Sequence, residues 1–297
     1  MVLTKADEAL LYEADCAMFA EEKLGLDLHE QRIRHFLNTR ADEVILLWSR
    51  QAGKTTGSAA KVTHRAVFSP GTLSLIVSAT QRQAGILQGR VTKFMHQLRR
   101  DGRWVKTGKS AVVYEDPLDA NSRMIRCSVL SMMLENGSEV VSVPASPETV
   151  RGYSPDLIVM DEAGMIPDEV YYAVRPMRIR TKAQLCVVSS AWAEVGFFYD
   201  TWKNREGWEK SEVKAKECAW VTAEELERER GQMPADRYAR EYENVFMPMQ
   251  GALLPADTIA AMYDEDEPMV VPAFTGRASG HMMDEGEDMV VLPVRRR

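Results

Sequence analysis

The chain has 297 residues, of which 45% are hydrophobic and 27% are charged, and its net charge is −7. These proportions are close to the average for globular proteins and exclude a wholly disordered or fibrous chain. No apolar run approaches the ~20 residues that span a bilayer, and the first turns of the chain are acidic, so we expect neither a membrane segment nor a secretory signal.

The first 40 residues (1–40) are predicted to be a helical segment. After it, short apolar runs recur at 44–48, 73–77, 157–160 and 185–188. They are too short for buried helices and continuous enough for strands that are covered on both faces. A stretch of helical length, 55–68, separates the first two runs. This order predicts an α/β fold with a central, mostly parallel sheet that is flanked by helices.

Between residues 110 and 143 the segments become shorter and alternating, and Asn136-Gly137 separates two β-type runs. That dipeptide predicts an antiparallel hairpin appended to the parallel strands. Thr222 and Glu225 form a capping box that opens a charged helix. We therefore expect one domain over 41–255, and an acidic tail or linker over 256–297.

The segment from Ser49 to Thr56 reads Ser-Arg-Gln-Ala-Gly-Lys-Thr-Thr and lies between the first predicted strand and the first long helix. Gly53 permits close backbone approach, Lys54 has the reach to contact β- and γ-phosphates, and Thr55 offers a hydroxyl to Mg²⁺. Trp48 stands where the usual phosphate-loop pattern has its leading glycine. The segment therefore predicts a variant phosphate-binding loop.

A second motif lies at 157–162, where an apolar strand ends in Asp161 and Glu162. An aspartate at the carboxyl end of a neighbouring strand is suited to the Mg²⁺ shell, and the glutamate after it is suited to polarising the attacking water. The loop comes first along the chain and the acidic pair later, which is the order expected of a phosphate-binding loop and the acids that act with it.

Together the motifs resemble the ATPase domain of the large subunit of viral (tailed bacteriophage) terminases, the motors that move DNA into procapsids. The family's variant loop contains an arginine and lacks the first glycine, as does 49–55 here. The resemblance extends upstream to Leu28-His29-Glu30-Gln31 and downstream to Arg151-Gly152 and to 187–191, so that it covers about residues 24–255.

The resemblance implies an additional-strand (ASCE-type) P-loop ATPase that binds ATP and Mg²⁺. It implies Glu162, Arg50 and Lys54 as catalytic residues, with Arg50 or an arginine from a neighbouring subunit neutralising charge on the γ-phosphate. Thr55 and Asp161 would hold Mg²⁺. The implied ATP-binding residues are Gln31, which would read the adenine, and Ser49, Arg50, Gln51, Ala52, Gly53, Lys54, Thr55 and Thr56. The implied coupling residues are Ser189, Ser190 and Ala191.

Two basic clusters are candidates for contacts outside the nucleotide site. From Arg90 to Lys109 the chain carries a local charge of about +6, which is suited to gripping DNA phosphates without sequence preference. Arg175, Arg178, Arg180 and Lys182 form the second cluster, which would contact DNA or supply an arginine to a neighbouring subunit. A solvated helix face is the alternative for the first cluster.

Large terminases usually carry a ribonuclease-H-like nuclease domain as well. The residues after Pro255 are too few for a fold of roughly 100 residues or more, so we expect no nuclease activity from this chain alone. The expected partners are double-stranded DNA, a portal protein, a small terminase subunit, further copies in a homo-oligomeric ring and possibly a separately encoded nuclease, in the host cell cytoplasm. No membrane is expected among the partners.

Two other functions fit the same motifs. A superfamily-2-type helicase shares the upstream glutamine, Lys-Thr and Asp-Glu, but needs a second RecA-like lobe that the residues after Ala191 are too few and too helical to provide. A non-enzymatic assembly subunit would bind nucleotide only to hold one conformation. Unwinding of a forked duplex and release of phosphate, respectively, distinguish these functions from a packaging motor.

Overall fold

A central sheet organises the computed structural model, which describes residues 4–28, 30–101, 105–107, 111–113 and 123–248. The tail predicted at 256–297, His29 and part of the basic run 90–109 lie outside these residues. Within them the main sheet has eight strands, in the order β10-β1-β9-β8-β2-β7-β6-β5. Their bounds are β1 Glu43–Trp48, β2 Leu73–Ser78, β5 Met124–Cys127, β6 Ser131–Leu134, β7 Glu139–Pro144, β8 Leu157–Asp161, β9 Gln184–Ser189 and β10 Glu209–Val213.

The parallel part of the sheet runs from β10 to β7, and its four central strands, β1, β9, β8 and β2, are the apolar runs predicted as strands. Side chains alternate between its two faces. Leu46, Val159 and Val188 belong to one buried cluster, whereas Ile158 and Val187 belong to the other. Both faces are covered, which is why these strands are continuously apolar rather than alternating. The predicted α/β fold with a mostly parallel sheet is confirmed.

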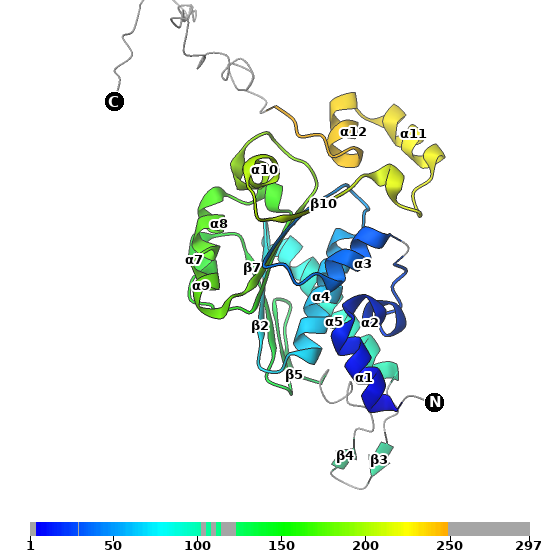
Figure 1. The fold of residues 1–297 in the computed structure, drawn as a ribbon, viewed down its shortest axis with the longest axis vertical. Coiled ribbons are helices and arrows are strands. Elements are labelled where there is room, and N and C mark those ends of the chain that lie inside the picture. Colours follow the sequence, from blue (N-terminus) through cyan, green and yellow to red (C-terminus); the bar gives the residue numbers. More distant parts are fainter. Residues whose placement is uncertain (1–3, 29, 102–104, 108–110, 114–122, 249–297) are drawn as a thin grey trace, which may run out of the picture. The chain divides into compact units, whose positions relative to one another are not determined.

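Helices cover both faces (Figure 1). On one side lie α1 Lys5–Ala14, α2 Cys16–Glu22, α3 Gln31–Asn38, α4 Lys54–Phe68 and α5 Gln81–Asp101. On the other side lie α7 Pro147–Val150, α8 Asp168–Val174, α9 Met177–Thr181 and α10 Gly196–Asn204. The N-terminal helices contribute Tyr12, Phe19 and Phe36 to the same buried cluster as β1 and β8. The helices α1, α2 and α3 therefore share the core of the sheet.

The predicted hairpin is present at the sheet edge. β6 and β7 pair antiparallel, and Gly137, in the connecting turn, has a left-handed backbone (φ 83°). Asn136 fixes the turn further, because its side-chain amide donates to the carbonyl of Ala66 at 2.8 Å. β5 then pairs antiparallel with β6. A separate two-stranded ladder is formed by β3 Val105–Thr107 and β4 Ala111–Val113.

Between β10 and residue 248, where the described residues end, lie two helices, α11 Ala223–Gln232 and α12 Ala235–Tyr242. The predicted capping box of Thr222 and Glu225 opens α11, with both reciprocal hydrogen bonds present. The part of the chain that the structure describes also has two short 3₁₀ turns, η1 Ala163–Met165 after β8 and η2 Ala215–Glu217 after β10. Among the described residues, no helix combines the length and the apolar character needed to cross a membrane.

Candidate nucleotide-binding site

Three strands bring the predicted motifs to one edge of the sheet. β9 lies between β1 and β8, with Leu47 opposite Ser189 and Asp161 opposite Val188. Because the strands are parallel, their carboxyl ends meet at the same edge, and the loop 49–53, the acidic pair and the segment after Ser189 all begin there.

The loop between β1 and α4 has the backbone of an anion cradle. Gln51 (φ 68°) and Gly53 (φ 84°) are both left-handed, and α4 begins at Lys54. A Cβ on Gly53 would come within 3.3 Å of the Ile33 side chain, so both space and conformation favour glycine. The first intrahelical bond runs from the Gly57 amide to the Gly53 carbonyl, which leaves the amides of the first turn for a ligand.

Trp48, in place of the expected glycine, is a core residue. It is fully buried at the end of β1, its ring meets that of Phe36 edge to face at 5.8 Å, and its indole nitrogen donates to the Ser211 hydroxyl at 3.1 Å. Burial of a side chain of this size contributes about 2–3 kcal/mol. The departure from the usual loop pattern therefore anchors the loop to α3 and β10.

Lys54 is held inside the loop. Its side chain is buried, and its ammonium donates to the carbonyls of Trp48 and Ser49, both at 2.9 Å. Burial lowers its pKa, while the carboxylates of Glu162 and Asp161 oppose that change. The lysine and the acidic pair therefore lie near enough to influence each other electrostatically, at the same end of the parallel strands.

Asp161 has the properties of a metal ligand. Its side chain is 4% exposed, and burial, reinforced by repulsion from Glu162, raises its pKa to about 7 against the attraction of Lys54. One carboxylate oxygen, Oδ1, is buried without a hydrogen-bond partner. A bound Mg²⁺ would satisfy that oxygen, and magnesium commonly takes only one or two protein ligands beside substrate phosphates and water. The donor set of Asp161 and Thr55 therefore fits magnesium.

Glu162 follows in a left-handed conformation (φ 53°), which is uncommon for a residue with a side chain. Backbone strain of this kind costs of order 1 kcal/mol and is concentrated at functional sites. The turn aims the chain away from β8 and into η1.

Ser189 connects β9 to this turn. Its hydroxyl is buried and accepts a hydrogen bond from the Gly164 amide at 3.1 Å. A Cβ on Gly164 would meet the Trp192 Cβ at 3.0 Å and the Ser189 hydroxyl at 3.1 Å. Ser190 is partly buried and Ala191 is buried directly after it. The segment predicted to couple hydrolysis to movement thus touches the turn that carries Glu162.

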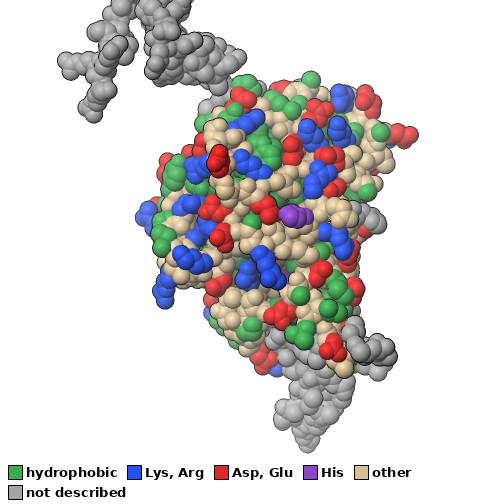
Figure 2. Space-filling view, viewed as in Figure 1, with side chains coloured by type: hydrophobic (Ala, Val, Ile, Leu, Met, Phe, Trp, Pro, Cys, Tyr) green, Lys and Arg blue, Asp and Glu red, His purple; other side chains and the backbone are tan. Residues whose placement is uncertain are grey.

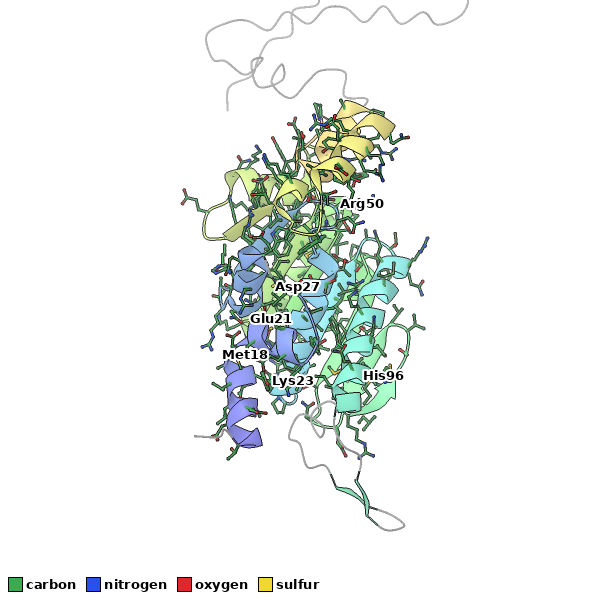
Figure 3. The ribbon with its side chains drawn as sticks, turned by 90° about the vertical axis from the view of Figure 1, so that its right-hand side faces the viewer. Met18, Glu21, Lys23, Asp27, Arg50 and His96 are labelled. Carbon is green, nitrogen blue, oxygen red and sulfur yellow. The ribbon has the colours of Figure 1, made fainter. Side chains whose placement is uncertain are left out.

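Arg50 is exposed and contacts α12. Its amide donates to the Glu241 carbonyl at 2.8 Å, and its guanidinium, 66% exposed, lies 3.4 Å from the Glu241 carboxylate. Figure 3 shows Arg50 next to the yellow helices α11 and α12. Glu241 was not predicted as part of the site.

A second residue that the sequence did not indicate, Asn244, supports the same corner. It is buried with a left-handed backbone (φ 60°), and its amide donates to the carbonyls of Leu47 and Val213, both at 3.0 Å. It thereby joins the ends of β1 and β10 beneath the loop. Its distance along the chain from Leu47 left no local signal of this contact.

The remaining predicted residues are distributed around the loop. Ser49 and Ala52 are buried, Thr55 and Thr56 are partly buried at the first turn of α4, and the Arg90 guanidinium donates to the Thr56 hydroxyl. Gln31, predicted to read the adenine, is exposed at the first position of α3.

The second basic cluster has a structural use. Arg175 and Arg178 both pair with Glu43 at the start of β1, and Arg178 also donates to the carbonyls of Ala183 and Asp42. These contacts lie at the sheet edge opposite the loop, and they leave Arg180 and Lys182 exposed. Figure 2 shows basic and acidic side chains interspersed on the face that it presents.

The strand order and the phosphate loop together indicate the class of fold to which the chain belongs. A strand inserted between the phosphate-loop strand and the acidic strand, here β9, is the feature of additional-strand P-loop ATPases, as predicted. A family model described as "Terminase large subunit, T4likevirus-type, N-terminal" matches residues 45–260, and the chain belongs to this family.

Solved structures share the fold. The ATPase domain of the Thermus phage P74-26 large terminase superposes with a TM-score of 0.59 at 18% identity, over 76% of this chain and 97% of that domain. The large terminases of bacteriophage HK97 (TM-score 0.56, 16% identity) and of a thermophilic bacteriophage in complex with ADP (0.54, 14%) match over 78% and 73% of this chain. The chain spans 54% and 53% of those two proteins. A search of curated protein sequences found no significant match.

Proposed function

We propose that this chain binds and hydrolyses Mg·ATP at the loop 49–56, as the motor subunit of a phage terminase that moves double-stranded DNA into a procapsid. The observation that carries the proposal is the meeting of Lys54 with Asp161 and Glu162 at one sheet edge. A buried lysine opposite two acids, beside free amides of a helix N-terminus, is suited to a triphosphate and its metal.

In the proposed mechanism, different residues of the site hold the phosphates, hold the metal and orient the attacking water. Lys54 and the first amides of α4 hold the phosphates, and Thr55 and Asp161 would hold the metal. Mg²⁺, when bound, neutralises phosphate charge and fixes the phosphate oxygens. Glu162 orients water for in-line attack by accepting its hydrogen bond, and Arg50, or an arginine from a neighbouring subunit, meets the charge that develops on the γ-phosphate.

Coupling would use the bond between the Ser189 hydroxyl and the Gly164 amide. Loss of the γ-phosphate changes the charge that faces Glu162, and the turn 162–164 transmits that change to the segment after Ser189. Such a contact between a catalytic turn and a second strand is the kind of element that converts hydrolysis into movement.

The motor role is supported by the family and by the printed names of the similar structures, which include large terminases in complex with ADP and with ATP-gamma-S. The partners we propose are double-stranded DNA, a portal protein, a small terminase subunit and further copies of the chain in a ring, in the host cytoplasm. A nuclease would be supplied outside the described residues or by another protein.

The Glu162→Gln variant tests the catalytic assignment. We expect it to bind Mg·ATP with nearly normal affinity and to lose turnover by a factor of about 10² or more, because the amide cannot accept the water's hydrogen bond as a carboxylate does. Affinity is measured by calorimetry. Turnover is measured as phosphate release, with and without DNA and portal-bearing procapsids. Near-normal hydrolysis would remove Glu162 from the mechanism, and absence of phosphate release from the unmodified protein under every condition would favour an assembly subunit.

A further inference from the structure

A pocket of about 270 Å³ opens beside the phosphate loop, and neither Asp161 nor Glu162 lines it. Its lining residues come from the segment before α3, from the loop and first turn of α4, and from the turn before α11. They are Leu26, Asp27, Leu28, Ile33, Gln51, Gly53, Thr56, Gly57 and Trp220. Asp27 marks the first of these segments in Figure 3. Exposed Gln31 is not among the lining residues.

Among the described residues of this lining, Trp220 is the one aromatic side chain, and it is 43% exposed. Its indole N–H donates to the Gln51 carbonyl at 2.9 Å, so its single polar atom is engaged by the loop itself. What the side chain leaves for a ligand is therefore flat, aromatic and apolar surface.

The backbone presents Trp220 from a fixed turn. Cys218 is buried and Val221 is partly buried, both in the cluster under α3 and α4, and the Val221 amide donates to the Cys218 carbonyl at 3.0 Å. The tryptophan thus lies on a turn whose two sides are packed into the core. A ring held in this way loses little conformational freedom when it contacts a ligand.

We propose that Trp220 is a base-stacking residue, which completes a purine pocket for the nucleotide whose phosphates lie on the loop. This inference rests on the function proposed above. Gly53 and Thr56 belong both to the phosphate loop and to the pocket wall, so a ligand with phosphates on the first turn of α4 carries its base towards Trp220. Leu28 and Ile33 supply an apolar wall for the same base. A planar heterocycle is therefore the occupant that fits.

Stacking on an aromatic side chain contributes to the affinity for the base and leaves the affinity for the phosphates unchanged. The test therefore compares Mg·ATP with Mg·tripolyphosphate, which has the phosphates and no base. Affinities are measured by calorimetry for the unmodified chain, Trp220→Ala, Trp220→Phe and Tyr172→Ala. Tyr172 is an exposed aromatic residue on α8 and serves as the matched control.

We expect Trp220→Ala to weaken ATP binding about tenfold or more and to leave tripolyphosphate binding unchanged. Trp220→Phe, which keeps a ring but not the N–H, should bind ATP with an affinity within about threefold of that of the unmodified chain. Tyr172→Ala should bind ATP as the unmodified chain does. ATP, but not tripolyphosphate, should quench indole emission in the unmodified chain, and most of that quenching should disappear in Trp220→Phe.

Two results would overturn the assignment. Equal weakening of both ligands by Trp220→Ala would make the residue a support of the loop through Gln51, and unchanged ATP binding would remove it from the site. If Trp220→Ala does not fold, the test rests on Trp220→Phe and the quenching measurement. Loss of quenching in Trp220→Phe, with tripolyphosphate binding retained, would place the base beside Trp220. Failure of the unmodified chain to bind either ligand would instead refute the phosphate site itself.

Discussion

At the scale of single residues, the corner beneath the loop contains charged and polar side chains that are buried, and such burial is stable only when each group has a partner. Lys54 and Asp161 are both buried, and each is stabilised in its charged form by the other. Asn244 is also buried and polar, but it is uncharged. Its left-handed backbone and its two carbonyl contacts join β1 and β10 directly below Ser49.

We predict that Asn244→Ala lowers the free energy of unfolding by about 3 kcal/mol, since two buried carbonyls lose a donor and alanine is strained at this φ. Asn244→Gly is the matched control, because glycine adopts this φ freely; it should cost about 1 kcal/mol less. Denaturant unfolding of both variants gives the two numbers. Equal stabilities would show that the backbone conformation is not under strain.

At the scale of elements, the N-terminal helices are attached to α4 through a partly buried histidine, His64. The imidazole of His64 contacts the rings of Phe19 and Phe68, at 5.6 and 4.8 Å, and its Nε2 lies 2.8 Å from the Tyr12 carbonyl. Burial lowers the pKa of His64 to about 4, and the nearby charges of Lys61 and Arg65 act in the same direction, against the Tyr12 carbonyl. The neutral ring is therefore the form that packs α1 and α2 onto α4.

A group with a lowered folded-state pKa stabilises the fold above its unfolded pKa, near 6.5, and that contribution is lost as the pH falls towards 4. From pH 7 to pH 5 we expect His64 to remove about 2 kcal/mol of stability. The difference between the two unfolding free energies should shrink by that amount in His64→Gln. His96→Gln, which changes an exposed histidine on α5, serves as the control and should not reproduce that change. An equal pH dependence in His64→Gln would place the titrating group elsewhere.

At the scale of the whole described unit, the site draws on segments from across the chain, from β1 and α4 through β8 and β9 to the region after β10. A ligand that binds only the folded chain stabilises it by about 2.7 kcal/mol at one hundred times its dissociation constant. For a unit of this size, that corresponds to a rise in Tm of roughly 5–10 °C.

We therefore predict that Mg·ATP raises the Tm by this amount in the unmodified chain, and that Lys54→Ala abolishes the rise because the variant no longer holds the phosphates. Lys203→Ala, which removes an exposed lysine on α10, serves as the control and should retain the full shift. Differential scanning fluorimetry is sufficient for all three proteins. A full shift in Lys54→Ala would mean that nucleotide binds away from the loop.

The amino-acid sequence by itself determined the strands β1, β2, β8 and β9 and the left-handed, glycine-bearing loop that opens α4. Strands buried on both faces require continuous apolar runs, and a phosphate loop requires glycine, lysine and a hydroxyl at fixed spacing, so both leave local patterns. β10 left none, because Glu209 to Val213 pairs on one side only, at the edge of the sheet, and reads as polar.

The tertiary structure alone decided which distant residues complete the site. Glu241, Asn244 and Trp220 reach the loop from positions far along the chain, and nothing in their own neighbourhoods marks them for it. The adenine role predicted for Gln31 came from the family resemblance and stays a prediction, whereas the residues that line the pocket come from three separate segments and are known only from the structure. Local chemistry specifies which backbone conformations a segment prefers, but contacts between remote segments exist only once the common core has brought them together.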